Sequence, residues 1–287
     1  MPIMKLIPAL KDYLWGGDYL KKYRQSNLDK IAESWELSMH KDGLSKVNIN
    51  GEIKNLKDAI TNMDLGKNLE QFSDFPVLIK LIDAKDNLSV QVHPSDEYAL
   101  KYEGQYGKTE MWYVIDAKED AGLYVGFKED ENVDKVRKYL NEGTILDHLN
   151  FFKVKKGDVF FIKSGTIHAI GKGVTLIEIQ QNSNLTYRLY DYNRKDKNGN
   201  LRPLHIDKAL NVIDYHKYKQ VNHEKNFLGI SKYFASYQKN AIIDKEIFEP
   251  DSFVSITFLD GKGTINGITY QKFDSFFISA GEKCFIE

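Results

Sequence analysis

The sequence predicts a mainly β protein, and three observations support this prediction. Runs of aromatic and β-branched residues recur along the 287-residue chain, and both residue types favour strands. Proline accounts for 6 residues, whereas many of the 20 glycines separate short apolar runs, as they do at turns between strands. One segment also occurs twice, which indicates two β units of related design.

Seven short apolar segments have the length and composition of strands. The predicted strands are 76–83, 88–93, 110–116, 121–127, 158–163, 174–180 and 185–192. Three other segments place apolar residues three or four positions apart, which is the spacing of one helix face. We therefore expect helices within 53–72, 132–149 and 206–214, packed on the β scaffold.

The segment that occurs twice is DVFFIKSGTIH at 158–168 and DSFFISAGEKC at 274–284. The aspartate, the Phe-Phe-Ile triplet and the glycine align at a constant offset. His168 in the first copy falls opposite Cys284 in the second. Any chemistry of His168 is therefore confined to the first unit.

The polar segment 193–204 is rich in turn-forming residues and predicts a loop near the boundary between the two units. We expect the first unit to span 1–215, with the helical segments at about 53–72 and 132–149 as insertions, and the second to span 216–287. The Asn-Gly pair at 266–267, between β-branched residues, predicts a two-residue hairpin within the second unit.

The composition argues against several classes of protein. The 40 Lys+Arg and 41 Asp+Glu residues nearly cancel, so neither nucleic acid nor an anionic membrane surface is an expected partner. Cys284 is the single cysteine, which excludes a disulfide framework and favours a reducing compartment. Lys5 and two prolines interrupt the amino-terminal stretch where a secretory leader needs apolar residues, and the apolar runs are short for a membrane span. We therefore expect a cytoplasmic protein.

Three polar side chains alternate along the predicted strand 88–93. Ser89, Gln91 and His93 share one face, because residues two apart on a strand point the same way, whereas the other face is wholly apolar. This pattern favours a polar row that lines a cavity. The alternative is an ordinary strand face exposed to solvent.

Two further residues complete a candidate metal site. Glu110 begins an apolar strand, where a carboxylate is costly to bury without a cation or a donor, and His168 follows a tight connection at Gly165. Two imidazoles and one carboxylate are typical of a catalytic metal site with an open position, and Gln91 could supply a fourth ligand. The alternative is that His93 only ends a strand before a proline and that His168 is a satisfied turn residue.

Charged residues on the neighbouring strands form a second candidate set. Lys80 interrupts the apolar run VLIKLI, and Lys108 and Arg188 lie beside the candidate ligands or on predicted neighbouring strands. An inward-facing cation needs an anionic partner, for which phosphate is a candidate, unless Lys80 lies on an edge strand and reaches solvent. Glu178 alternates with isoleucines, so it faces a polar space and is suited to proton transfer or to orienting a ligand.

These residues resemble a known family. The segment 157–168 is similar to the second cupin motif, with Lys163 where that motif prefers proline. Four motifs resemble more specifically the type I mannose-6-phosphate isomerases in their short bacterial form: SVQVHP (89–94), GKTEMWYV (107–114), SGTIHAI (164–170) and NLTYRLYDYNR (184–194). The segments LWGG (14–17) and ESWELS (33–38) also fit this family.

The resemblance implies a double cupin-like scaffold of jelly-roll β barrels with helical insertions. It implies a zinc enzyme, with one Zn²⁺ per chain, that interconverts mannose 6-phosphate and fructose 6-phosphate. By matched position, the implied zinc ligands are His93, Glu110 and His168, with Gln91 as a further ligand. Arg188 matches the family's active-site arginine and Lys108 a lysine of the substrate pocket, which Ser89, Lys80 and Glu178 also line. We therefore expect Arg188 and Glu178 to act in catalysis, and Lys108, Ser89 and Lys80 to bind the substrate.

Two features depart from the family pattern. Ile170 stands where longer members carry a tyrosine in the pocket. The sequence also ends about where relatives continue into a terminal strand. We therefore expect the second unit to lack a final strand and residues 271–287 to form an unpaired edge.

The expected function is that of a metal-dependent aldose–ketose isomerase that acts on a phosphorylated hexose. The reaction moves a proton between C1 and C2 through an enediolate, so it needs an acid/base group, positive charge near the oxyanion and a phosphate anchor. The residues do not decide which group abstracts the proton. The expected partner is a small-molecule sugar phosphate, and the expected state is a monomer, with a weak homodimer as the alternative.

Two other functions fit the same residues. Two histidines and a carboxylate also form the site of Fe(II)-dependent cupin oxygenases. A non-catalytic cupin that binds a sugar phosphate is the third reading, although a pure binder does not need an open metal position.

Overall fold

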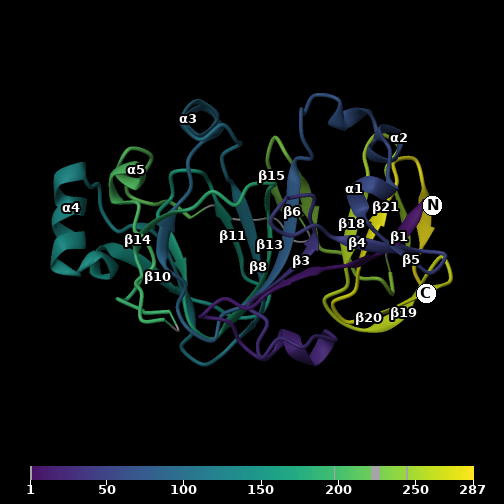
Figure 1. The fold of residues 1–287 in the computed structure, drawn as a ribbon, viewed down its shortest axis with the longest axis horizontal. Coiled ribbons are helices and arrows are strands. Elements are labelled where there is room, and N and C mark those ends of the chain that lie inside the picture. The colour runs from purple at the N-terminus through teal and green to yellow at the C-terminus, as the bar shows by residue number, and fades with distance from the viewer. Residues whose placement is uncertain (1, 197, 221–226, 244) are drawn as a thin grey trace.

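The computed structural model describes residues 2–196, 198–220, 227–243 and 245–287. The protein is mainly β, as predicted, and its strands gather into two groups that lie side by side along the longest axis (Figure 1). The larger group holds the candidate site. The smaller group contains both ends of the chain (Figure 1).

Two antiparallel sheets form the larger group. The six-stranded sheet has the order β11 (Val159–Ile162), β8 (Glu110–Ala117), β13 (Val174–Gln181), β6 (Val77–Asp83), β3 (Glu33–Leu37) and β2 (Ala9–Lys11). The five-stranded sheet has the order β10 (Leu149–Lys153), β9 (Gly122–Phe127), β12 (His168–Ile170), β7 (Val90–Val92) and β14 (Tyr187–Tyr190). One buried apolar cluster contains side chains of both sheets, among them Trp112 and Val125, so the two sheets face each other as a barrel.

The smaller group is built on a third sheet, with the order β18 (Val254–Thr257), β21 (Ser275–Ile278), β1 (Ile3–Ile7), β4 (Lys46–Ile49) and β5 (Glu52–Asn55). Three two-stranded pairs complete the described strands: β15 (Phe227–Ile230) with β16 (Ala235–Tyr237), β17 (Glu246–Phe248) with β22 (Lys283–Phe285), and β19 (Lys262–Ile265) with β20 (Ile268–Gln271).

The helices are short. The α-helices are α1 (Leu56–Ala59), α2 (Asn62–Leu65), α3 (Asp96–Tyr102), α4 (Val133–Glu142) and α5 (Ile206–Leu210), and the 3₁₀ turns are η1 (Leu20–Tyr23), η2 (Lys67–Leu69) and η3 (Ile145–His148). Helices α4 and α5 pack on the outer face of the five-stranded sheet (Figure 1). None of the helices in the described ranges is long and apolar enough to cross a membrane.

The seven predicted strands are all present as β6, β7, β8, β9, β11, β13 and β14, with ends that differ by a few residues. Helices also form within 132–149 and 206–214 as α4, η3 and α5. The prediction for 53–72 is wrong as a single helix, because this segment consists of the end of β5 followed by α1, α2 and η2.

Local backbone signals explain the interruption within 53–72. Ile60 is extended, and Thr61 and Asp64 form a capping box that starts a new helix. Gly66 ends that helix with a φ of 83°, a conformation that favours glycine. Two apolar positions of the predicted face, Ile53 and Met63, are 59% and 88% exposed, so no continuous apolar face is buried.

The internal repeat corresponds to a repeated strand–turn–strand. The two copies of Phe-Phe-Ile lie in β11 and β21, and the aligned Gly165 and Gly281 have φ values of 85° and 75°. Strands β12 and β22 follow these glycines. The predicted hairpin is also confirmed, because Asn266 and Gly267 connect β19 to β20 with positive φ angles.

The topology corrects two expectations about the second unit. Strands β1, β4 and β5 belong to the same sheet as β18 and β21, so residues 216–287 alone do not contain that sheet. The expected unpaired edge at 271–287 is wrong, because β21 pairs with both β1 and β18, and β22 pairs with β17. The amino-terminal strand supplies the missing neighbour. That the two groups are separate domains stays a prediction.

An apolar layer joins the two groups of strands. It contains the outward-facing residues of β6, β8 and β13, such as Leu81 and Met111, together with Met4 and Phe277 of the third sheet. A buried ion pair lies at the same junction: Glu36 accepts from Arg24 at 2.6 Å, and its other oxygen accepts from Ser275 at 2.8 Å. The smaller group therefore buries the outer face of the sheet that carries the candidate site.

Phe277→Ala tests this junction. Phe277 is fully buried in the shared layer, so its truncation should cost about 3–5 kcal/mol of unfolding free energy. Urea unfolding followed by tryptophan fluorescence checks this, because Trp15, Trp35 and Trp112 all lie in the larger group of strands or in the segments beside it.

The matched control is Phe285→Ala, since Phe285 is 46% exposed, and its effect should stay within about 0.5 kcal/mol. Equal effects of the two substitutions on the tryptophan signal would contradict a shared core.

Candidate metal centre

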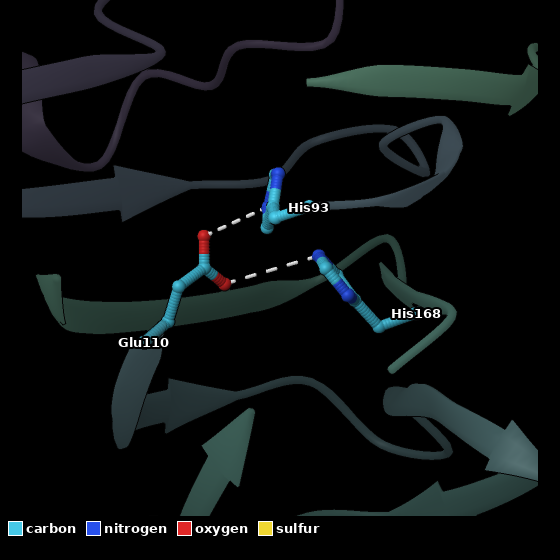
Figure 2. Close-up of side chains that lie close together, drawn as sticks. All are labelled: His93, Glu110 and His168. Atoms are coloured by element: carbon cyan, nitrogen blue, oxygen red, sulfur yellow. Dashed lines mark ion pairs between the residues drawn. The ribbon is translucent and has the colours of Figure 1, made fainter. Parts of the chain in front are cut away.

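Three side chains from three strands meet inside the barrel. His93 follows β7, Glu110 is the first residue of β8, and His168 is the first residue of β12. His93 Nε2 lies 3.0 Å from Glu110 Oε1, and His168 Nε2 lies 3.8 Å from Glu110 Oε2 (Figure 2). The three residues are at most 1% exposed. We refer to them as the triad.

Backbone carbonyls fix the orientation of both imidazoles. His93 Nδ1 lies 2.9 Å from the Leu185 carbonyl oxygen, and His168 Nδ1 lies 2.8 Å from that of Thr166. A carbonyl only accepts, so each Nδ1 carries the proton and each neutral ring turns the lone pair of Nε2 towards Glu110. Lone pairs and carboxylate oxygens thus face one another, and a cation between them would satisfy both.

Several acceptor atoms of the triad have no hydrogen-bond donor. Neither His93 Nε2 nor either Glu110 oxygen has a hydrogen-bond partner of good geometry, although the Lys108 ammonium forms an ion pair with Glu110 Oε1. Buried polar atoms are normally paired, so these acceptors fit metal ligands. One ligand atom from each residue lies within 4.8 Å of the other two, so a single cation could contact all three residues.

The protonation states also suit a metal. Burial lowers the pKa of His93 to about 3, and burial likewise lowers the pKa of His168. Burial alone would raise the pKa of Glu110, but the adjacent Lys108 and His93 hold it well below its usual value. At neutral pH the triad therefore offers two neutral imidazoles and one carboxylate, which are the forms that bind a cation.

Gln91 lies within reach of the triad. Its amide nitrogen is 3.3 Å from His168 Nε2, and strand pairing sets Gln91 directly opposite His168. Rotation of the amide by 180° would present its oxygen to the same point. The structure thus brings together the four residues that were predicted as metal ligands.

The six-stranded sheet supplies the charged neighbours of the triad. In its register Glu178 is opposite Lys80 and Trp112, and Gln180 is opposite Glu110. Directly paired residues share a face, so all these side chains point into the barrel. The other face of the same strands packs into the apolar layer, and this explains why β6 reads as an apolar run with one lysine.

Glu178 is the centre of a buried charge network. Its Oε2 accepts a hydrogen bond of 2.9 Å from the Trp112 indole, and its Oε1 lies 3.4 Å from Lys80 Nζ and 3.8 Å from Lys108 Nζ. Burial raises the pKa of Glu178, and the negative charge of Glu110 raises it further. Lys80 is 3% exposed, so the alternative of a solvent-reaching lysine on an edge strand is wrong.

Arg188 and Ser89 lie beside the triad without contacting it directly. Arg188 is opposite Gln91 in the pairing of β14 with β7, one strand further from His168, and its guanidinium donates to the Pro203 carbonyl at 2.9 Å. Ser89 is 3% exposed and precedes Gln91 by two residues. Ile170 packs in the apolar cluster between the sheets.

Sequence reasoning assigned no role to Glu33 and Trp35. Glu33 lies 3.7 Å from Lys80 and accepts a 2.6 Å hydrogen bond from the Trp35 indole, whose ring also lies under the Lys80 ammonium. An acidic residue and a tryptophan two positions apart on a buried strand could have indicated a buried network of charges and hydrogen bonds. The carbonyls of Leu185 and Thr166, in contrast, have no side-chain signature.

Facing antiparallel sheets that enclose a candidate His–Glu–His metal site are the architecture of the cupin class. A family model described as the catalytic domain of type I phosphomannose isomerase matches residues 3–121. The mannose-6-phosphate isomerase ManA of Bacillus subtilis is 36% identical over 273 residues, which cover 89% of this chain and 85% of that protein. The chain belongs to the mannose-6-phosphate isomerase family.

Solved structures agree with this assignment. A crystal structure of the mannose 6-phosphate isomerase from Bacillus subtilis is 30% identical and has a TM-score of 0.87, with 100% of this chain and 97% of that chain covered. A zinc-bound mannose 6-phosphate isomerase shares the fold at 16% identity, with a TM-score of 0.74 and 100% of both chains covered.

His168→Ala tests the metal centre. The wild-type protein should bind about one divalent metal ion per chain, and the variant should lose most of it, because one of three converging ligands is removed. Elemental analysis after dialysis measures this. The control is Cys284→Ala, at the position aligned with His168 in the repeat, which should keep its metal. Full metal content in the His168 variant would refute the site.

Proposed function

We propose that the protein is a zinc-dependent aldose–ketose isomerase that interconverts mannose 6-phosphate and fructose 6-phosphate. The observation that carries this proposal is the buried triad, in which unpaired acceptors of His93 and Glu110 converge with the His168 imidazole next to Lys108. The family membership supports the choice of isomerisation over oxygenation or simple binding. The expected substrate class is a phosphorylated hexose.

The reaction moves a proton between C1 and C2 of the open-chain sugar through an enediolate. It needs a group that transfers the proton, positive charge where oxygen becomes negative, and a holder for the phosphate. In this proposal His93, Glu110 and His168 hold the zinc, with Gln91 as a fourth ligand. Bound zinc would supply Lewis-acid polarisation of the sugar oxygens.

The charge balance of the barrel interior supports an anionic substrate. Glu33, Glu110 and Glu178 contribute three carboxylates against the two ammonium groups of Lys80 and Lys108, so the network carries a formal charge of about −1. A divalent cation at the triad reverses this sign. The interior then attracts the phosphate or the developing enediolate.

We assign the two lysines and Ser89 to substrate binding. Lys108 is held between Glu110 and Glu178, so its ammonium is presented beside the triad at a fixed position. Burial opposes the charge on Lys80, but Glu33 and Glu178 keep its pKa above the ordinary value. Lys80 therefore stays cationic at neutral pH, and its ammonium is suited to binding sugar or phosphate oxygens.

We assign Glu178 to proton transfer or to orienting the substrate, and Arg188 to stabilising negative charge. A raised pKa brings a carboxyl closer to neutral pH, where it exchanges protons most effectively. The Glu178 Oε1 atom has no hydrogen bond of good geometry, so it is free to accept one from a sugar hydroxyl. Arg188 offers a planar donor fork on the adjoining strand.

A coupled assay of fructose 6-phosphate formation tests the function. The metal-loaded protein should convert mannose 6-phosphate without consuming dioxygen, since the isomerisation has no net redox change. Removal of the metal with a chelator should abolish turnover, and added zinc should restore it. Turnover that requires dioxygen would favour the iron oxygenase, and binding of mannose 6-phosphate with no turnover would favour a sugar-phosphate-binding protein.

Glu178→Gln separates the role of Glu178 from that of Glu110. The substitution keeps the shape of the side chain and removes its proton-transfer capacity, so kcat should fall by on the order of a hundredfold while the metal content stays intact. Steady-state kinetics and elemental analysis on the same sample check this. Loss of metal would make Glu178 a ligand, and unchanged kinetics would exclude it from the reaction.

A further inference from the structure

One buried carboxylate, that of Asp191, binds two arginines in the segment that follows β14. Asp191 is 5% exposed and accepts two hydrogen bonds from Arg202, one from Nε at 2.7 Å and one from Nη2 at 2.6 Å. Arg194 also donates to Asp191, and its other terminal nitrogen donates to the Asn87 carbonyl. Asp191 thus links Arg202 to the end of β14, and Arg194 links the same segment to the barrel through Asn87.

The contacts of Asp191 with Arg202 bring the following residues of the chain next to Arg188. The Pro203 carbonyl accepts from Arg188 Nη1 at 2.9 Å, one residue after Arg202. The backbone of Arg188 is held in the same way, because its N–H donates to His205 Nδ1 at 3.2 Å and its carbonyl accepts from the His205 N–H at 2.7 Å. The position of the Arg188 guanidinium therefore depends on where residues 202–205 lie.

The charges around this segment are unequal. Asp191 forms ion pairs with both Arg194 and Arg202, whereas Arg188 forms none of the ion pairs found in the described ranges. Arg188 Nε is buried without a hydrogen-bond partner. Arg188 therefore has an N–H group available for an anion, whereas Arg194 and Arg202 donate to Asp191. Without the Asp191 charge, three neighbouring cations would repel one another.

We propose that Asp191 is a positioning residue that aims Arg188 at the substrate by holding Arg202, and with it residues 203–205, in place. This inference rests on the proposed function, because it assumes that Arg188 acts on a bound sugar phosphate. Asp191 itself touches neither the triad nor Glu178 in its described contacts. Its effect on the reaction must therefore pass through Arg188.

A double-mutant cycle tests this dependence. Arg188→Ala should lower kcat by on the order of a hundredfold, and Asp191→Asn by on the order of tenfold, with the metal content of both variants unchanged. In the Arg188→Ala background, Asp191→Asn should change kcat by less than about twofold, because the group it positions is gone. A purely structural role of Asp191 would instead lower kcat by the same factor in both backgrounds.

Two further variants complete the experiment. Arg202→Lys keeps the charge but not the bidentate contact, so it should lower kcat less than Asp191→Asn and show the same dependence on Arg188. It also provides the test if the Asp191 variant does not fold. The control is Asp207→Asn, which removes the carboxylate of the exposed Arg137–Asp207 ion pair and should leave kcat unchanged.

Two results would overturn the inference. One is an unchanged kcat in Asp191→Asn, and the other is equal losses with and without Arg188. An inactive wild-type enzyme would instead refute the proposed function, and this inference with it, before any variant is compared.

Discussion

The structure depends on hydrogen-bond acceptors that face one another at a buried position inside the barrel. Backbone carbonyls turn the Nε2 lone pairs of His93 and His168 towards Glu110, and all three side chains are buried. Acceptors that face one another at a buried position are unfavourable unless a donor or a cation lies between them. The surrounding lysines and glutamates fit this requirement, because they leave the interior slightly negative until a divalent ion is added.

The rest of the fold keeps this polar interior rigid. Strands β6, β8 and β13 carry charged groups on one face and apolar residues on the other, so the apolar face must be covered from water. The third sheet covers the apolar face, and the amino-terminal strand β1 takes part in that cover by pairing with β21. The smaller group of strands thus contributes to the site without supplying a residue to it.

Much of this could be predicted from local sequence. Period-two alternation correctly placed Gln91 and His93 on one inward face, and the strand-forming runs located seven of the strands of the barrel but missed β2, β3, β10 and β12. Other features depend on distant pairing. The cover supplied by β1 joins residues at opposite ends of the chain, and a helical spacing in 53–72 was overridden by a capping box and Gly66. The ion pairs of Asp191 were also missed, because a single aspartate between tyrosines has no distinctive spacing.

X-ray absorption at the zinc edge of the zinc-loaded protein tests the central claim most directly, since it reports which atoms surround the metal. The arrangement of the triad predicts imidazole nitrogen from two histidines together with oxygen, all at about 2.0–2.1 Å. A sulfur ligand at about 2.3 Å, or a shell of oxygen without imidazole, would contradict it. Either result would place the metal away from His93, Glu110 and His168.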